Sequence, residues 1–423
     1  MNRKTGLIGL LVGTTLSMLG SRMTMVALPW LVLETTDSPG KTGIVGAVEL
    51  LPYVLACALG GPLIDRVGGR RVSVACDALS FFAVGMIPLL AGTGRLTFPA
   101  LVLLVAVIGL LRGLGDTAKH GAMFPQTVEQ AGTEMTRAAT LIDGLSRGSS
   151  MVGVVLAGAL ITWFGGAANV LLFDALSFGL CALIIGLFVR VPGRAEHAEK
   201  EPYLAALRGG VAFMKRDSLV LGIGVMVAIT NTLDQAAGSV LNPLWAREIY
   251  GSAVGLAVIG ASFGAGAVLG NIVFAIFAPK APRWTLYTIG FLIAGGPRFV
   301  VLAFGAPTWL LLVNGFIDGL AVAAINPIIG AVTYERTPEK LQARVMGLLS
   351  AVAYAGMPLG ALLGGWLGGF GAKPALLITG AIYLLATLMP FFGRFWRQMD
   401  IRPAPKTERA GDRQEEAIGA TVA

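Results

Sequence analysis

The chain has 423 residues, of which 55% are hydrophobic and only 13% are charged. A soluble globular chain carries about 25% charged residues, and the mean hydropathy here is +0.76, so the composition excludes a soluble domain and indicates a polytopic membrane protein. The net charge of +8 does not indicate nucleic-acid binding, because the basic residues are spread over short loops, a pattern typical of orientation signals facing anionic lipid.

Twelve apolar segments are each long enough to cross a bilayer, which takes roughly 20 residues. If the first begins in the cytoplasm, the loops on that side hold 23 of the 32 lysine and arginine residues, and the opposite loops hold four. Cytoplasmic loops carry such an excess, so we predict a multi-pass protein of the cell inner (plasma) membrane with both termini cytoplasmic. The predicted spans are 6–33, 42–64, 72–92, 97–120, 138–164, 168–189, 218–245, 254–278, 284–305, 307–333, 342–370 and 373–395.

A dense group of charges separates the second and third spans. The connection is too short to form a domain, and its glycines allow the backbone to turn sharply, so we predict a tight hairpin at the cytoplasmic surface. Asp77, near the start of the third span, is expected to brace the arginines of this hairpin. The residues that define the hairpin are Gly61, Asp65, Arg66, Gly68, Arg70 and Arg71.

The longest central connection divides the spans six and six. Within it, Leu204, Leu207, Val211 and Met214 recur at helical spacing, which predicts an amphipathic helix on the inner membrane surface. We therefore divide the chain into an N-terminal six-helix bundle (1–190), a cytoplasmic linker with this helix (191–217), a C-terminal six-helix bundle (218–397) and a cytoplasmic tail (398–423). The tail is polar and charged, and is predicted to be disordered.

The two halves carry matching residues at nearly one offset. Arg112-Gly113-Leu114 of span 4 is followed 206 positions later by Asp318-Gly319-Leu320 of span 10. Gly153 and Gly158 of span 5 have counterparts 207 positions later. The matching residues occur in the same order in both halves and are separated by nearly the same number of positions. This pattern indicates a duplicated six-helix unit, as in many transporters.

Four ionisable side chains fall near the centres of predicted spans. Such groups cost at least ~2.5 kcal/mol each on insertion scales, and are retained where they pair or face water. Two interpretations stay open: a structural ion pair within the membrane, or the handling of protons or substrate. The four residues are Arg22 in span 1, Arg112 in span 4, Asp234 in span 7 and Asp318 in span 10.

Other polar residues accompany these charges. Asp116 lies four residues after Arg112 and can pair with it along one helix face, and Glu49 lies in the outer third of span 2. Asn231 and Asn314, in spans 7 and 10, could donate hydrogen bonds to a substrate, although bonds between helices are the alternative use.

Glycines recur every four residues along span 11, at Gly356, Gly360, Gly364 and Gly368. They place a flat strip on one helix face, so that another helix can approach closely. Gly260 and Gly264 do the same in span 8. Simple helix packing is one explanation, and a sliding surface between the two halves is the other.

Motifs for catalysis are not found in the sequence. It has no phosphate-binding loop and no Ser-His-Asp arrangement, and its two histidines, His120 and His197, are too far apart to suggest a zinc site. The three cysteines lie in apolar runs without a C-x-x-C spacing, and are expected to pack as small apolar side chains. We predict no enzyme activity, no cofactor and no metal site, so uphill transport would draw on an ion gradient.

The charged hairpin resembles the loop between helices 2 and 3 that marks the major facilitator superfamily, roughly G-x-x-x-D-R-x-G-R-R/K. Its six defining residues match that pattern, while Gly69 stands where the family often has a basic residue. Arg112 with Gly115 and Asp116 is similar to the family's span 4 motif in a looser form. The 153–158 stretch resembles the antiporter motif, with Val154 in place of its proline. Segments 27–30 and 342–347 resemble the bacterial drug-export branch, which includes macrolide-efflux and enterobactin-export proteins.

This resemblance implies an all-α integral membrane fold, with twelve transmembrane helices in two pseudo-symmetric six-helix bundles. Spans 1, 4, 7 and 10 would line a central cavity, with two arginines on one wall and two aspartates on the other. Protonation of Asp234 or Asp318 would release Arg22 or Arg112 across that cavity. When the inner ends close, Asp65 would meet the start of span 11 near Arg344.

The implied function is a secondary active transporter that exports small amphipathic molecules, such as drugs and antibiotics, by alternating access coupled to proton antiport. Its expected partners are that substrate, protons and membrane lipid, without nucleic acid, and the chain is expected to be monomeric. The alternatives are a lipid or lysolipid flippase and a siderophore or metabolite exporter. The lack of a catalytic cluster and of a sizeable soluble domain disfavours a non-transporting receptor or a membrane-embedded enzyme.

Overall fold

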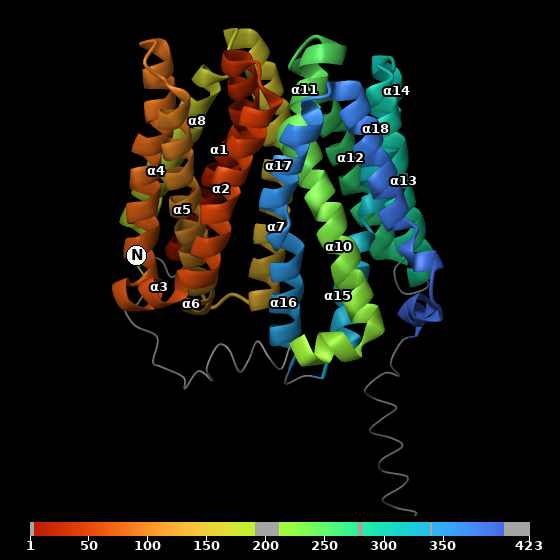
Figure 1. The fold of residues 1–423 in the computed structure, drawn as a ribbon. Coiled ribbons are helices and arrows are strands. Elements are labelled where there is room, and N and C mark those ends of the chain that lie inside the picture. Colours follow the sequence, from red (N-terminus) through yellow and green to blue (C-terminus); the bar gives the residue numbers. More distant parts are fainter. Residues whose placement is uncertain (1–3, 191–210, 278–281, 339–340, 402–423) are drawn as a thin grey trace, which may run out of the picture.

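The computed structural model describes residues 4–190, 211–277, 282–338 and 341–401. Twelve of its helices are long and apolar enough to cross a membrane, which confirms the predicted number of spans. They run side by side as an upright bundle (Figure 1). We call the lower end in that view the α3 end and the upper end the α11 end, after the short helices that lie there.

The first half is built from six spans. Span 4 continues without a break from α5 through the π-helical turn η1 into α6, so it ends ten residues beyond its predicted end. The elements are α1 (Thr5–Thr36), α2 (Pro39–Leu59), α4 (Gly69–Gly92), α5 (Phe98–Thr117), η1 (Ala118–Met123), α6 (Phe124–Gln130), α7 (Met135–Phe164) and α8 (Ala168–Phe188).

The second half repeats this arrangement. Its span 11 is interrupted at Gly356, because Pro358 lacks the N–H that a continuous helix would need there. The elements are α10 (Ser218–Ala236), η2 (Ala237–Leu241), α11 (Asn242–Trp245), η3 (Ala246–Tyr250), α12 (Val254–Phe277), α13 (Arg283–Ala303), α14 (Thr308–Val322), α15 (Ile325–Arg336), α16 (Gln342–Ala355), α17 (Met357–Gly368), α18 (Ala372–Thr387), η5 (Met389–Phe391) and η6 (Arg394–Asp400).

The connection predicted as a tight hairpin contains a short helix, α3 (Gly61–Val67), and the prediction is wrong in this detail. Pro62 stands in the first turn of α3, where its missing N–H costs nothing. The chain then turns at Gly68, whose φ of 96° is easily adopted only by glycine. Of the predicted linker, residues 211–217 are described, and 211–216 are helical. Its Leu204 and Leu207, and the tail from 402, lie outside the described residues.

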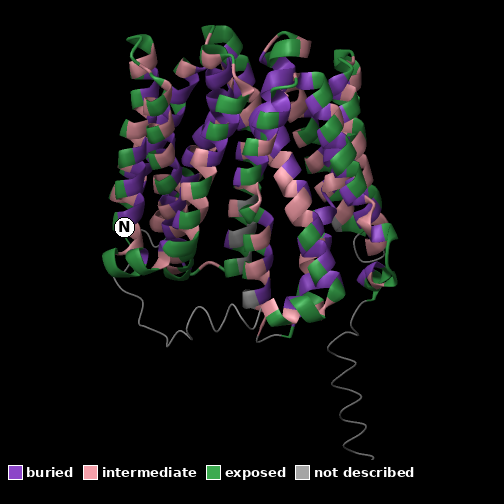
Figure 2. Cartoon of the chain, viewed as in Figure 1, coloured by how far each residue is buried: buried purple, intermediate pink, exposed green. Residues whose placement is uncertain are grey.

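Side-chain burial agrees with a bundle that lies in lipid. Buried and exposed residues alternate along the helices of the bundle (Figure 2), and many of the exposed residues have large apolar side chains. Leu59, Leu187 and Ile276, for example, are 65–71% exposed. In water this surface would aggregate, whereas in a bilayer it faces acyl chains.

The two halves meet at two glycine-rich contacts. In the contact of α2 with α17, a methyl group added at Gly43 would lie 2.5 Å from the Ala361 carbonyl oxygen and 2.9 Å from the Gly365 Cα. In the contact of α7 with α12, a methyl group at Gly158 would lie 3.0 Å from the Ala253 carbonyl oxygen. The halves therefore touch through backbone, and the space between them forms the cavity described next.

Candidate functional site

A cavity of about 380 Å³ lies between the two halves. The first half lines it from α1, α2, α5 and α7, and the second half from α10, η2, α11, α12, α13 and α14. Most of the lining is apolar, with a few ionisable and amide side chains among the apolar ones. The polar lining residues include Arg22, Glu49, Arg112, Gln235, Asn242, Arg298, Asn314 and Asp318.

Arg112 is paired on its own side of the cavity. Its Nη1 donates to Glu49 Oε1 at 2.6 Å, and its guanidinium lies over the Tyr53 ring, 5.4 Å from the centroid. Asp116, the predicted partner of Arg112, instead accepts a hydrogen bond of 3.3 Å from the Tyr53 hydroxyl. The predicted pairing along α5 is therefore replaced by pairing between α5 and α2. Gly113 allows this approach, because a methyl group there would lie 2.5 Å from the Tyr53 carbonyl oxygen.

The Arg112–Glu49 pair gives a first testable prediction. Replacing Glu49 by glutamine leaves the Arg112 charge without its partner in a largely buried place, and breaking such a pair costs about 3–5 kcal/mol. We expect Glu49→Gln to have a clearly lower melting temperature than the wild type in detergent. Unfolding is monitored by tryptophan fluorescence. The matched control is Glu34→Gln, because Glu34 is exposed near the end of α1. Equal melting temperatures for the two variants would contradict a stabilising role.

Arg22 presents a charge that the first half does not neutralise. It lines the cavity from α1, and its Nη1 lies 3.5 Å from Met25 Sδ. Among the described side chains, no carboxylate lies within ion-pair distance of it. α7 packs closely behind it, since a methyl group at Gly153 would lie 2.6 Å from Arg22 Cβ. Arg22 is thus held in place and available to a negative group in the cavity.

The second half has an ion pair that was not predicted from the sequence. Arg298 of α13 forms an ion pair with Asp234 of α10, and its guanidinium lies over the rings of Phe299 and Tyr383, 4.6 and 5.1 Å from their centroids. The prediction that two aspartates face two arginines across the cavity is therefore wrong in this conformation. Asp234 is paired within its own half and is absent from the cavity lining, which Arg298 joins instead.

Asp318 does line the cavity, as predicted. It is 5% exposed, and its Oδ1 accepts no hydrogen bond from the described residues. Arg298 and Asp234 are its charged neighbours. A buried carboxylate oxygen without a donor is costly, so this group is suited to bind a proton or a cationic ligand.

The remaining predicted residues divide between lining and packing. Asn314 lines the cavity, whereas Asn231 donates to the Ala353 carbonyl oxygen at 3.2 Å and links α10 to α16. Among the strip glycines, Gly356, Gly360 and Gly364 pack against α10 of the same half, and only Gly368 also reaches Pro39 of the first half. The predicted sliding strip of span 11 is therefore mainly a packing strip. Gly260 and Gly264, in contrast, face Val154 and Met151 across the two halves.

The predicted gate at the α3 end is described only in part. Arg70 donates to the Gly186 carbonyl oxygen and ties the start of α4 to the end of α8. Asp65, Arg66 and Arg71 are exposed at the surface. The side chain of Arg344 lies outside the described residues, so its contact with Asp65 stays a prediction.

At the α11 end, a side-chain contact joins the halves. Arg247 of η3 donates from Nη1 to the Leu33 carbonyl oxygen at 2.5 Å, and its Nη2 lies 2.8 Å from Asp37 Oδ1, just after α1. Arg247 falls in the connection between the predicted spans 218–245 and 254–278, and its role was not predicted. Together with the contact of α2 with α17, this bond holds the halves together at the α11 end.

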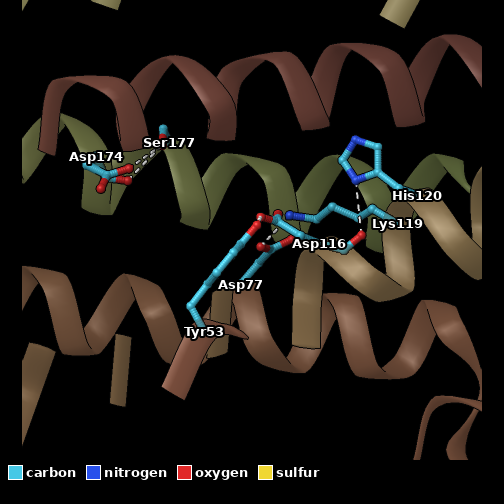
Figure 3. A network of polar contacts seen from close by, with 7 residues as sticks. All are labelled: Tyr53, Asp77, Asp116, Lys119, His120, Asp174 and Ser177. Atoms are coloured by element: carbon cyan, nitrogen blue, oxygen red, sulfur yellow. Dashed lines mark hydrogen bonds and ion pairs between the residues drawn. The ribbon is translucent and has the colours of Figure 1, made fainter. Parts of the chain in front are cut away.

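A second buried polar contact, in the first half, was also not predicted from the sequence. Lys119 of η1 donates to Asp77 Oδ1 at 2.7 Å, and both side chains are almost fully buried (Figure 3). The expectation that Asp77 braces the hairpin arginines is therefore wrong. The π-helical turn carries Lys119 in the stretch that follows α5, and such turns are frequent at functional sites.

Two six-helix halves around a central, partly charged cavity define a polytopic membrane protein with the architecture of a transporter. Comparison with known families agrees. The chain belongs to the Major Facilitator Superfamily, whose family model matches residues 10–237 and again 224–422.

Individual relatives cover nearly the whole chain. The multidrug efflux pump Tap of Mycobacterium tuberculosis (strain ATCC 25618 / H37Rv) is 28% identical over 406 residues, covering 95% of this chain and 96% of Tap. Macrolide efflux protein A of Streptococcus pyogenes is 20% identical, covering 92% and 96%. Among solved structures, the nucleoside transporter NupG has a TM-score of 0.73 at 15% identity, covering 95% of this chain and all of NupG. An inward-facing, unoccupied bacterial homologue of the lysosomal transporter Spinster has a TM-score of 0.67 at 17% identity, covering 95% and 99%. These likenesses show the shared fold.

Proposed function

We propose that the protein exports small amphipathic molecules, including drugs, by alternating access. The observation that carries this proposal is the cavity between the halves, because it combines a mostly apolar lining with one unneutralised arginine, Arg22, and one buried carboxylate, Asp318. Such a cavity suits ligands with an apolar body and a polar or charged group. The names of the relatives, a multidrug efflux pump and a macrolide efflux protein, support the same substrate class.

The orientation belongs to the proposal. The excess of basic residues predicts that the α3 end, with both termini, is cytoplasmic. With the halves joined at the α11 end, the described conformation is then closed toward the outside. Export requires the opposite state, in which the α11 end opens and the drug leaves.

The Arg247 bond gives a second testable prediction. Replacing Arg247 by alanine removes its charge-assisted hydrogen bond to Leu33, and bonds to charged groups are worth about 1.5–3 kcal/mol. We expect Arg247→Ala to raise the population open at the α11 end, measured as faster labelling of a cysteine at Ser239 by an impermeant maleimide added outside. Arg95→Ala is the control, because Arg95 lies in another loop at this end. Unchanged labelling with Arg247→Ala would show that the bond does not hold the closed state.

Proton coupling is the finer part of the proposal. Asp318 is suited to carry the proton, since its Oδ1 has no donor among the described residues and Arg298 is a charged neighbour. When Asp318 is ionised, it competes with Asp234 for Arg298. When it is protonated, Arg298 stays with Asp234 and the cavity accepts a cationic drug less well. Proton entry from outside would therefore favour drug release there.

The test is transport by the purified protein in proteoliposomes. We expect a macrolide or another amphipathic drug to move against its gradient when a pH gradient is imposed, and to stop when a proton uncoupler is added. Scrambling of labelled lipid without drug movement would favour the flippase. Drug binding without any flux would favour a receptor and contradict the proposal.

A further inference from the structure

Outside the cavity, the first half contains a line of buried polar side chains. α1 carries Thr14, Ser17, Ser21 and Thr24, all at most 9% exposed. Their spacing of three or four residues places them on one helix face. α1 packs against α8, with Thr24 bonded to Asp174 and Gly13 close to Cys181, and Asp174, Ser177 and Cys181 of α8 are also buried. We call these seven residues the polar seam.

Asp174 is the ionisable carboxyl group of the seam. It is 1% exposed. Thr24 Oγ1 donates to its Oδ2 at 2.5 Å. Ser177 Oγ donates to the Asp174 carbonyl oxygen at 2.8 Å and also lies 3.2 Å from its Oδ1. Among the described residues, no lysine or arginine lies within ion-pair distance of it. An ionised carboxylate that is buried with hydroxyl partners alone is costly.

The charged groups that act on Asp174 come from neighbouring helices. They are Arg112 of α5 and Glu49 of α2, which pair with each other at 2.6 Å. In the described parts of α1, α4 and α7, no charged side chain bonds to Asp174. The Arg112–Glu49 pair is neutral as a unit, so it does not replace a counter-ion. Asp174 therefore needs a proton or a bound cation.

The packing favours a proton over a metal ion. Gly20 of α1 faces Asp174 and Ser177 so closely that a methyl group there would lie 2.5 Å from Asp174 Oδ1. The hydroxyl groups of Thr24 and Ser177 lie at hydrogen-bonding distance from the two carboxylate oxygens. Hard cations such as calcium take six or more oxygen ligands, whereas the side-chain oxygens joined here by hydrogen bonds are the two of the carboxylate and those of two hydroxyl groups, and the described residues contain no cluster of three or more His, Cys, Asp or Glu side chains that could hold a metal.

The seam continues toward the α3 end. The Cys181 thiol lies beside Asp77 and Lys119. Asp77 is 2% exposed, and its Oδ2 accepts no hydrogen bond from the described residues. Figure 3 shows Asp174 and Ser177 on the same helix, with the Asp77–Lys119 pair farther along the bundle. Protonatable groups thus follow one another from Asp174 to this pair, away from the drug cavity.

We propose that Asp174 is a proton-carrying site separate from the drug cavity, and that it exchanges its proton along the polar seam through Asp77 and Lys119. The O–H bond of the Asp174 carboxyl group breaks, each group along the path accepts a proton and releases one to the next, and the last proton passes to water at the α3 end. Thr24 is two residues from Arg22 on α1, so the charge left on Asp174 acts on the helix that lines the cavity. This inference rests on the proposed proton coupling of transport.

The experiment has a readout that does not depend on transport. Infrared spectroscopy of the purified protein at neutral pH should show a protonated carboxyl C=O band that is lost in Asp174→Asn. In proteoliposomes, we expect drug binding by Asp174→Asn to be unchanged, while accumulation driven by a pH gradient falls by roughly tenfold or more, equivalent to ~1.4 kcal/mol.

A second variant retains the carboxyl group in case Asp174→Asn does not fold. The Thr24 hydroxyl donor stabilises the ionised form of Asp174. Thr24→Val removes this donor and so favours the protonated form, and the pH at half-maximal transport should rise. Thr127→Val, which changes a buried hydroxyl of α6 outside the seam, is the control. The proposal is overturned if Asp174→Asn removes no part of the wild-type protonated carboxyl band, if pH dependence is unaltered in both seam variants, or if the part of the band lost in Asp174→Asn responds to sodium. If the wild type lacks pH-driven transport but shows the band, the proposed coupling fails while Asp174 is still protonated.

Discussion

Replacing Asp318 by asparagine is expected to abolish proton-driven export while drug still binds. Asparagine has nearly the same shape but cannot carry the proton, and it no longer competes for Arg298. We expect drug accumulation driven by a pH gradient to fall by about tenfold or more, equivalent to ~1.4 kcal/mol. The measurement is drug uptake into inverted vesicles at several pH values, with drug affinity measured separately.

A matched control is Glu335→Gln, because Glu335 is an exposed carboxylate of the same half, paired with Arg283 at 2.6 Å. It should keep wild-type transport and pH dependence. Asp234→Asn is the informative companion, since it leaves Arg298 without its partner and should weaken both coupling and stability. Wild-type pH dependence in Asp318→Asn would remove this residue from the coupling mechanism.

Replacing Gly43 by valine is expected to prevent closure at the α11 end. The added carbons would meet the Ala361 carbonyl oxygen and the Gly365 Cα, which are backbone and cannot move aside easily. Overpacking costs about 1–3 kcal/mol, so the equilibrium should move roughly 5- to 150-fold toward the form open at this end. Transport should fall because the protein no longer returns to its other state.

The readout is the labelling of a cysteine at Ser239 by an impermeant reagent from outside, in a background without the three native cysteines. Gly166→Val is the control, because a methyl group at Gly166, between α7 and α8, meets nothing within 4 Å. A slow labelling rate in Gly43→Val, equal to that of the wild type, would show that the contact of α2 with α17 does not set the closed state.

The fold was predictable to the level of twelve spans in two halves, because hydropathy and the side preference of basic residues are physical constraints of the bilayer itself. Helix ends were less predictable. α3 looked like a hairpin because its seven residues include a glycine, a proline and two charges, and are too few to show a clear apolar period. The extension of span 4 beyond residue 120 was hidden by His120 and by Pro125 soon after it, although proline is tolerated in the first turn of α6.

The cavity charges were partly predictable. Arg22, Arg112 and Asp318 line the cavity from the spans expected, because an ionisable group in hydrocarbon must face a partner or water. Their partners were not predictable, since pairing depends on helix rotation and on which neighbours contain glycine. Glu49 reaches Arg112 through the close approach of α2 and α5. Arg298 was visible as a charge in span 9, and its position inside an apolar run was the signal that could have marked it.

The central claim is that the halves move against each other around the cavity. It is tested by measuring the distances between spin labels at two pairs of exposed sites. One pair is Lys41 with Lys373 at the α11 end, and the other is Arg66 with Tyr334 at the α3 end. Both distances are measured at high and at low pH, with and without drug. The account predicts reciprocal changes, with one distance growing as the other shrinks. Distances that stay constant, or that change together, while the same protein transports drug would contradict it.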